Sequence, residues 1–194
     1  MNFLKRTYNW TLEKAQHKYA KWYLSLISFA ESSFFPIPPD ILLIPMALDS
    51  KANALFYAFI CTLFSVLGGI LGYAIGYFFY NSVGIYIVEF YHLENSFNIF
   101  EYYYKEFGIL IVLGAGITPF PYKFITIASG VFELNIFLFI IVSIFGRGLR
   151  FYLIAILLYF FGEKIRLIID KYFNILTIVF FILLVGSVFI IRFL

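Results

Sequence analysis

The chain has 194 residues, of which 63% are hydrophobic, 23% are aromatic and 13% are charged. Soluble domains are about half apolar and about a quarter charged, so this composition excludes an ordinary soluble protein and predicts a single domain within a lipid bilayer. The formal net charge of +3 is too small to indicate a nucleic-acid partner, and the one cysteine, Cys61, has no second cysteine with which to form a disulfide.

Residues 1–21 are expected to form a basic amphipathic helix on the membrane surface. Aromatic residues such as Trp10 and Trp22 recur at near-helical spacing, and charged side chains fall between them, as is typical of interfacial helices. The charges are mostly basic: Lys5, Arg6, Lys14, Lys18 and Lys21 against Glu13. Because basic segments are retained in the cytoplasm, we expect the amino terminus on that side of the membrane.

Residues 22–48 are expected to form a re-entrant hairpin. This stretch carries Pro36, Pro38 and Pro39 near its centre, and a proline removes a backbone donor and clashes with the preceding turn, so the helix must break there. A broken backbone is tolerated in hydrocarbon only where protein buries it or it lines a wet cavity. Asp40 follows the break, where its carboxylate is positioned to cap the second half-helix. A functional role for Asp40 is the alternative.

Residues 52–80 contain no charge and are expected to span the membrane. One face of this helix carries glycines at spacings of three and four: Gly68, Gly69, Gly72 and Gly76. Such a face is typical of close packing against another helix. The next segment, residues 81–106, is acidic, with Glu89, Glu94, Glu101 and Glu106 against Lys105. Because this segment lacks the positive charge that retains a loop in the cytoplasm, we expect it on the external side.

Residues 107–131 repeat the hairpin pattern, with a break at Pro119 and Pro121. An offset of 83 places Pro36 on Pro119, Pro38 on Pro121 and Asp40 on Lys123. A long apolar segment follows each hairpin. Since the acidic segment between the hairpins is expected outside, the second hairpin enters from the opposite face of the membrane. The sequence therefore predicts an inverted repeat of the kind found in transporters.

Residues 135–161 are expected to form the next transmembrane helix, and residues 172–191 the last one. Arg147 and Arg150 lie within the first of these helices and, spaced by three, share one helical face. At about 1.5 Å per residue, Arg147 is about 18 Å from Asn135, near the middle of a hydrocarbon core of about 30 Å. A charge at that depth costs about 3 kcal/mol unless it is paired or hydrated.

The charges at membrane depth are candidate site residues: Glu31, Asp40, Lys123, Arg147 and Arg150. In a structural interpretation, the acids of the first hairpin neutralise the bases of the second repeat and stabilise the fold. In a functional interpretation, the two arginines and Lys123 bind an anionic headgroup, because arginine presents a planar fork that suits phosphate, while Glu31 and Asp40 exchange protons. The interpretations are compatible, since a pair that opens when substrate enters couples binding to movement.

Several of these motifs resemble the DedA family of bacterial inner-membrane proteins, also described as the VTT or SNARE-associated Golgi protein domain. The resemblance covers about residues 22–161 and includes Glu31, Pro-Pro-Asp at 38–40 with Ile-Leu-Leu after it, the glycine-rich helix, and Thr-Pro-Phe-Pro-Tyr-Lys at 118–123 with Ala-Ser-Gly at 128–130. Residues 121–123 together with 146–151 resemble its YqaA-type branch.

The DedA resemblance implies facing re-entrant hairpins and the transport of lipid between leaflets, including undecaprenyl phosphate and phospholipids. It also implies that Glu31 and Asp40 are functional and linked to protons. The chain departs from the family pattern Arg-x-x-Pro-x-x-Arg in the second hairpin, because Gly116 stands in place of the first arginine and Lys123 is the only base. We expect Arg147 and Arg150 to supply this charge from the next helix.

The sequence therefore predicts an all-α, multi-pass protein of the bacterial inner membrane that moves an anionic lipid, either a polyprenyl phosphate or a glycerophospholipid, across the bilayer. A proton-coupled transporter of a small soluble ion is the alternative. No histidine–acid constellation, paired metal ligands or nucleophile elbow indicates an enzyme, and no cofactor or metal is expected. Membrane lipids are the expected partners, and association into a homo-oligomer stays open.

Overall fold

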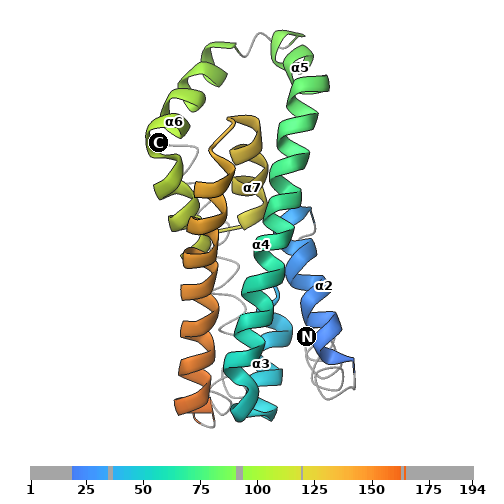
Figure 1. The fold of residues 1–194 in the computed structure, drawn as a ribbon, viewed down its shortest axis with the longest axis vertical. Helices are drawn as coiled ribbons and strands as arrows, with labels where there is room; N and C mark the ends of the chain where they lie inside the picture. The colour runs from blue at the N-terminus through green and yellow to red at the C-terminus, as the bar shows by residue number, and fades with distance from the viewer. Residues whose placement is uncertain (1–18, 35–36, 91–93, 119, 163, 165–194) are drawn as a thin grey trace, which may run out of the picture.

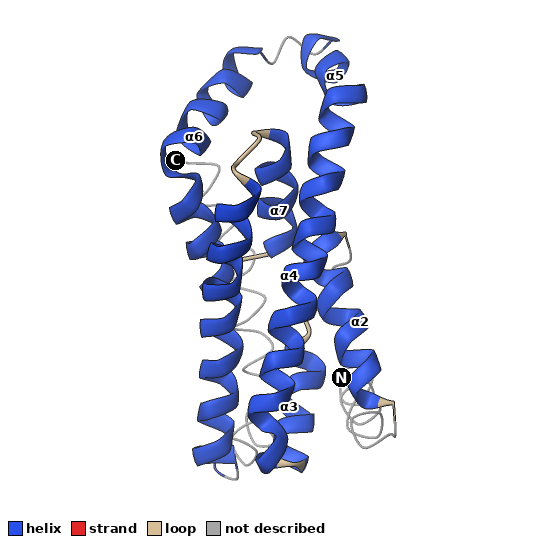
Figure 2. Cartoon of the chain, viewed as in Figure 1, coloured by secondary structure: helices blue, strands red, loops and turns tan. Residues whose placement is uncertain are grey.

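The computed structural model describes residues 19–34, 37–90, 94–118, 120–162 and 164. These residues form helices joined by short turns, with no strand among them, which confirms the expected all-α fold for this part of the chain (Figures 1 and 2). Three expectations lie outside the described residues: nearly all of the basic amphipathic helix at 1–21, the prolines Pro36 and Pro119, and the transmembrane helix at 172–191.

The first hairpin consists of α2 (Ala20–Ser33) and α3 (Asp40–Asp49). In Figure 1, α2 runs upward to the middle of the molecule and α3 returns to the lower end. The break falls at the expected prolines, since Pro39 directly precedes the first residue of α3. The expectation that Asp40 caps α3 is wrong: no side chain caps this helix, and the carboxylate of Asp40 bonds to Arg150 instead.

The central helix α4 (Ala54–Phe79) follows a short 3-10 turn at Lys51–Asn53. It continues through a π-helical turn (Tyr80–Gly84) into α5 (Ile85–Phe90). The next helix, α6 (Glu94–Ile117), is 24 residues long. The first arm of the second hairpin therefore begins at Glu94 and not at residue 107. Acidic residues are compatible with a helix, and Glu101 pairs with Lys105 one turn later at 2.6 Å.

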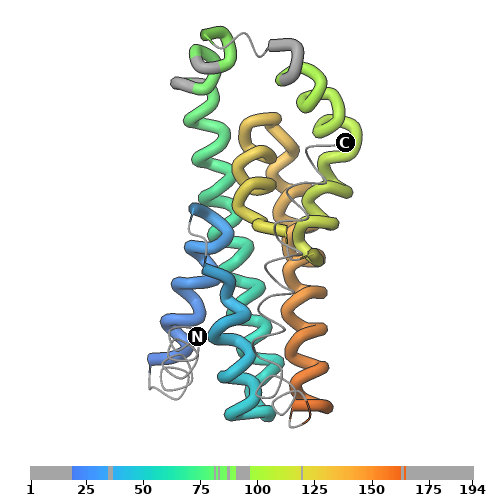
Figure 3. The backbone as a smooth tube through the Cα atoms, turned by 180° about the vertical axis from the view of Figure 1, so that it is seen from behind, coloured from blue at the N-terminus to red at the C-terminus, as the bar shows by residue number. Residues whose placement is uncertain are grey.

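The second hairpin closes with α7 (Tyr122–Val131), which begins directly after Pro121. A long helix, Ile136–Gly162, follows. It is capped by Asn135, whose side-chain oxygen accepts hydrogen bonds from the backbone N–H groups of Phe137 and Leu138 at 3.0 and 3.2 Å. Figure 1 and the view from behind in Figure 3 place the second hairpin at the upper end of the molecule, so the tips of the hairpins meet in the middle.

The elements after each proline break match in length and spacing. Both α3 and α7 have 10 residues, and they begin at Asp40 and Tyr122, which are 82 positions apart (122 − 40 = 82). The long helices that follow begin at Ala54 and Ile136, again 82 positions apart (136 − 54 = 82). The offset between matching elements is therefore 82, one less than the offset of 83 that aligns the prolines.

The glycine face of α4 packs against both hairpins, as the spacing of its glycines predicted. A Cβ atom at Gly72 would overlap the hydroxyl of Thr126 in α7 and would also crowd the carbonyl oxygen of Ser32 in α2. At this point the Thr126 hydroxyl donates a hydrogen bond of 2.9 Å to the Ser32 carbonyl. The absence of a side chain at Gly72 thus lets the hairpin tips bond directly to each other over α4.

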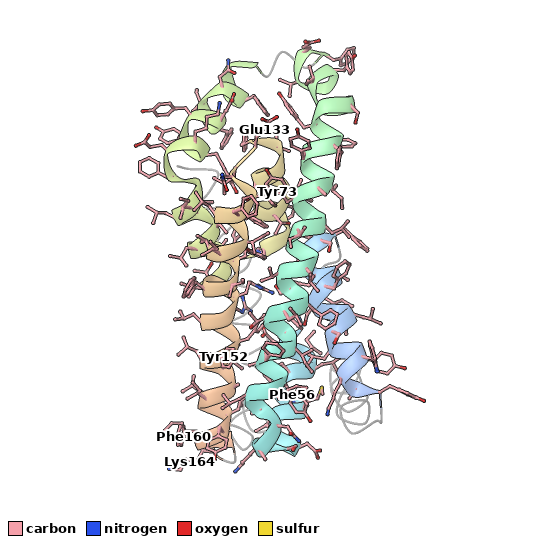
Figure 4. The ribbon with its side chains drawn as sticks, viewed as in Figure 1. Phe56, Tyr73, Glu133, Tyr152, Phe160 and Lys164 are labelled. Carbon is pink, nitrogen blue, oxygen red and sulfur yellow. The ribbon has the colours of Figure 1, made fainter. Side chains whose placement is uncertain are left out.

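The turn after α7 contains the one non-glycine residue with a positive φ in the described part of the chain, Glu133 at 51°. The Leu134 N–H bonds to the Ser129 carbonyl and the Glu133 N–H to the Gly130 carbonyl, a helix ending in which glycine usually takes the left-handed position. The hydroxyl of Tyr73, labelled beside Glu133 in Figure 4, donates to the carbonyl of Leu134 at 2.7 Å. This bond anchors the turn to α4.

Replacing Glu133 with glycine is expected to stabilise the protein by up to about 1 kcal/mol, because the left-handed conformation costs an L-residue about that much. Glu133 is exposed, so the change removes little packing. Unfolding by denaturant in detergent micelles measures the effect. Glu133→Ala is the control, since it removes the same charge and keeps the strain. An equal gain from alanine would assign the effect to charge instead of backbone conformation.

Candidate functional site

The candidate site is a pair of ion pairs between the Ile136–Gly162 helix and the first hairpin. Arg147 bonds to Glu31 of α2 at 2.6 Å, and Arg150 bonds to Asp40 at the start of α3. Four of the five charges that the sequence placed at membrane depth are thus brought together. Acids of the first hairpin are therefore paired with bases of the second repeat, as the structural interpretation requires.

Arg147 is enclosed on every side that the structure describes. Only 1% of its surface is exposed. One guanidinium N–H donates to Glu31, and Nε donates to the hydroxyl of Ser65 in α4 at 2.6 Å. The faces of the guanidinium lie 4.9 Å from the ring of Tyr122 and 4.7 Å from the ring of Phe151. Aromatic faces attract a cation, and more strongly where water is excluded.

Hydroxyl groups complete the surroundings of this first ion pair. Ser32 donates to the Glu31 carboxylate at 3.1 Å and shares a hydrogen bond of 2.6 Å with Ser65. The Tyr122 hydroxyl shares a hydrogen bond of 2.6 Å with Ser143. The sequence reasoning missed these residues, because serine and tyrosine hardly alter the hydropathy of an apolar segment. A signal for Ser65 was present: it continues the glycine face of α4 by one turn toward the amino end.

Arg150 contacts both hairpins and is less enclosed. Its Nη2 donates to Oδ2 of Asp40, and its Nη1 donates to the carbonyl of Thr118, just before the second break, at 2.7 Å. The Arg150 and Asp40 side chains are 16% and 19% exposed. The other carboxylate oxygen of Asp40, Oδ1, is buried and has no hydrogen-bond partner in the part of the chain that the structure describes.

Lys123 has a different partner from the one expected. Its ammonium group lies 5.4 Å from the ring of its neighbour Phe124. Within the described residues it forms no ion pair with Glu31 or Asp40, whose partners are Arg147 and Arg150. Of the three predicted bases, the two arginines pair with the acids of the first hairpin, and a role for Lys123 in headgroup binding stays a prediction.

Two proteins share most of the length of this chain. It is 37% identical over 164 residues to an uncharacterized protein of Haemophilus influenzae, with 84% of this chain and 85% of that protein covered. It is 35% identical over 167 residues to an uncharacterized HI0703 homolog of Histophilus somni, again with 84% and 85% covered. The chain belongs to the family of these proteins. No family model and no solved structure matches it.

In this member of the HI0703-like family, arginine side chains supply the positive charge of the site. Across the described residues, no group of three or more histidine, cysteine, aspartate or glutamate side chains gathers to hold a metal ion. The guanidinium groups already bind carboxylates, and the same planar fork of donors binds phosphate. The arrangement is therefore suited to holding an anion between the hairpin tips and the long helix.

Proposed function

We propose that this protein is a multi-pass protein of the bacterial inner membrane that moves an anionic lipid between leaflets. The membrane assignment is supported by the described helices Lys51–Phe79 and Ile136–Gly162, which have 29 and 27 residues. At about 1.5 Å per residue, each is about 40 Å long and exceeds a hydrocarbon core of about 30 Å. Only 28% of the most apolar part of Ile136–Gly162 is buried, whereas the core helix of a soluble protein is mostly buried.

The distribution of polarity also supports a lipid environment. The exposed side of α4 carries a large apolar residue at every fourth position: Leu55, Phe59, Leu63, Leu67, Leu71 and Ile75. The buried side chains include Arg147 and several serines and threonines. Soluble monomers rarely expose apolar patches of more than a few hundred Å². An apolar exterior around a polar interior is the arrangement that a bilayer favours.

The ends of the molecule differ in charge, which supports an orientation. Lys51 lies beside Gly162, and Lys21 lies over the ring of Phe56, so both belong to the lower end, together with Lys164 in Figure 4. Glu133 is labelled at the upper end, and α5, which carries the exposed Glu89, lies at that end as well. By the positive-inside rule, the lower end is cytoplasmic.

The opposed hairpins and the offset of 82 between matching elements support an inverted repeat. In transporters of that architecture, the substrate site lies near the midplane, where broken helices meet. The resemblance to DedA proteins adds lipid transport to this argument. Here the hairpin tips meet where Thr126 bonds to Ser32 and where Arg150 contacts both Asp40 and Thr118.

The single observation that carries the proposal is the placement of paired arginines between both hairpins on a helix with an apolar outer face. A phosphate headgroup satisfies the guanidinium donors, while its acyl chains stay against the apolar exterior. A polyprenyl phosphate and an anionic glycerophospholipid both have this chemistry. The purified protein in liposomes is therefore expected to exchange labelled anionic lipids between leaflets. Absence of exchange with every anionic lipid, with and without a proton gradient, would contradict the proposal.

Arg150→Gln is expected to reduce the rate of leaflet exchange by at least about tenfold. A hydrogen bond to a charged group contributes about 1.5–3 kcal/mol, and about 1.4 kcal/mol corresponds to a tenfold change. Lys105→Gln is the matched control, because it removes the same charge at an exposed position whose ion pair, among the described residues, is with Glu101 of the same helix. Exchange at the wild-type rate in Arg150→Gln, measured on folded protein, would exclude Arg150 from headgroup binding.

A second candidate is a proton-coupled transporter of a small soluble ion. It is favoured by Oδ1 of Asp40, which is buried and has no hydrogen-bond partner among the described residues, because such an oxygen can still accept a proton or a small cation. This candidate predicts saturable uptake of a water-soluble ion into liposomes of neutral lipid, driven by a pH gradient. The lipid transporter predicts no such uptake.

A further inference from the structure

The ion pairs at the hairpin tips differ in how completely they are satisfied. Glu31 accepts hydrogen bonds from Arg147 and from Ser32, and Arg147 is also held by Ser65 and stacked between aromatic rings. Opening this pair would leave a guanidinium that is 1% exposed without a counter-ion. Removing one partner of such a pair costs about 3–5 kcal/mol. The ion pair of Arg147 and Glu31 is therefore expected to remain intact.

The pair of Arg150 and Asp40 lacks these supports. Only one oxygen of the Asp40 carboxylate is bonded, while Oδ1 is buried without a partner among the described residues. The hydrogen bond from Nη1 of Arg150 to the Thr118 carbonyl lies at the protein surface and does not involve Asp40. This bond holds the guanidinium in place when Nη2 changes its partner. Departure of Asp40 therefore breaks one contact and leaves the other intact.

We infer that the carboxylate of Asp40 occupies the place of a substrate anion on Arg150, and that a phosphate group binds there by displacing it while Arg147 and Glu31 remain paired. The inference rests on the proposed function, which supplies the phosphate. The exchange replaces one anion with another, so Arg150 is never left without a counter-charge. Because Asp40 is the first residue of α3, its release removes the ion pair between the start of α3 and the long helix, while Glu31 and Arg147 still join α2 to that helix.

The test is the affinity of Asp40→Asn for phosphate-bearing probes. While the Asp40 carboxylate occupies Arg150, the site is closed to other anions, and this lowers the apparent affinity for them. Removing the charge of Asp40 is therefore expected to tighten binding at least about fivefold. The probes are inorganic phosphate and short-chain phosphatidic acid, with phosphatidylcholine of the same chain length as the zwitterionic control, titrated calorimetrically into protein in neutral detergent. Tighter binding of both probes assigns the site to the phosphate group itself, and tighter binding of the lipid alone assigns it to a lipid headgroup.

Two further variants identify the cation. Asp40→Asn combined with Arg150→Gln is expected to lose the gain, and Glu31→Gln is expected to give none. The inference is overturned if Asp40→Asn binds no more tightly than wild type, if the double variant keeps the gain, or if Glu31→Gln produces it as well. Should Asp40→Asn fail to fold, the wild-type chain still decides: its binding of phosphatidic acid must survive Lys105→Gln and disappear in Arg150→Gln.

Folding is monitored at the one cysteine of the chain, Cys61, which is fully buried in α4 and should resist maleimide in every folded variant. The inference and the proposed function fail separately. If Asp40→Asn binds phosphate more tightly but the protein does not exchange lipids between leaflets, the proposed function is contradicted and the inferred phosphate site still stands. If the protein exchanges lipids between leaflets but Asp40→Asn does not bind the phosphate probes more tightly, the inferred site is contradicted and the proposed function still stands.

Discussion

Arg147→Met is expected to destabilise the fold by about 3–5 kcal/mol, the range measured when one partner of a buried ion pair is removed. Methionine fills a similar volume between Tyr122 and Phe151, so the loss comes mainly from the charge. The carboxylate of Glu31 would keep only the hydrogen bond from Ser32 while remaining largely buried. Denaturant unfolding in mixed micelles measures the difference in free energy of unfolding.

The double variant Glu31→Leu with Arg147→Met is the control for this prediction. It removes the unpaired charge, so most of the lost stability should return, because replacing both partners of a buried pair by apolar residues of similar volume is often nearly neutral. Arg150→Met should cost less than Arg147→Met, since its ion pair is more exposed. A double variant as unstable as Arg147→Met would mean that packing, not charge, determines the role of Arg147.

The pairing of acids with arginines could be predicted because charge burial in an apolar chain is expensive, so every deep charge needs a partner. The alignment of the repeats by their prolines, in contrast, paired Asp40 with Lys123. Matching elements are 82 positions apart, which places Tyr122, not Lys123, on Asp40. Neighbouring residues on a helix differ by about 100° in direction, so Tyr122 faces inward to stack on Arg147 while Lys123 lies by Phe124.

Other features depend on tertiary contacts that no local pattern records. The helix α3 starts one residue earlier than a cap at Asp40 requires: Pro39 takes the N-cap position, Asp40 is the first helical residue, and its carboxylate bonds to Arg150, 110 positions later. The hydroxyls of Ser32 and Ser65 become significant only when α2 and α4 cross and bring Arg147 between them. The acid-rich stretch before residue 107 was expected to lie outside the hairpin, but side-chain polarity does not prevent the helix α6 from starting at Glu94.

Gly130→Ala is expected to have an effect close to that of Arg147→Met, with a loss of about 3 kcal/mol in the free energy of unfolding, the upper part of the range typical of overpacked positions. A Cβ atom at Gly130 would overlap the carbonyl oxygen of Tyr73 and crowd the backbone nitrogen of Tyr77. The contact is reciprocal, since a Cβ atom at Gly76 would overlap the carbonyl oxygen of Ile127. Neither obstacle is a flexible side chain, so α7 must move away from α4 as a unit.

Gly114→Ala is the matched control, because a Cβ atom there has no neighbour within 4 Å. Gly114→Ala should raise the free energy of unfolding by up to about 1 kcal/mol, the difference in helix propensity between alanine and glycine.

If Gly130→Ala unfolds like wild type, α7 is not held against α4 by this contact. A shift of α7 would also carry Tyr122 away from Arg147.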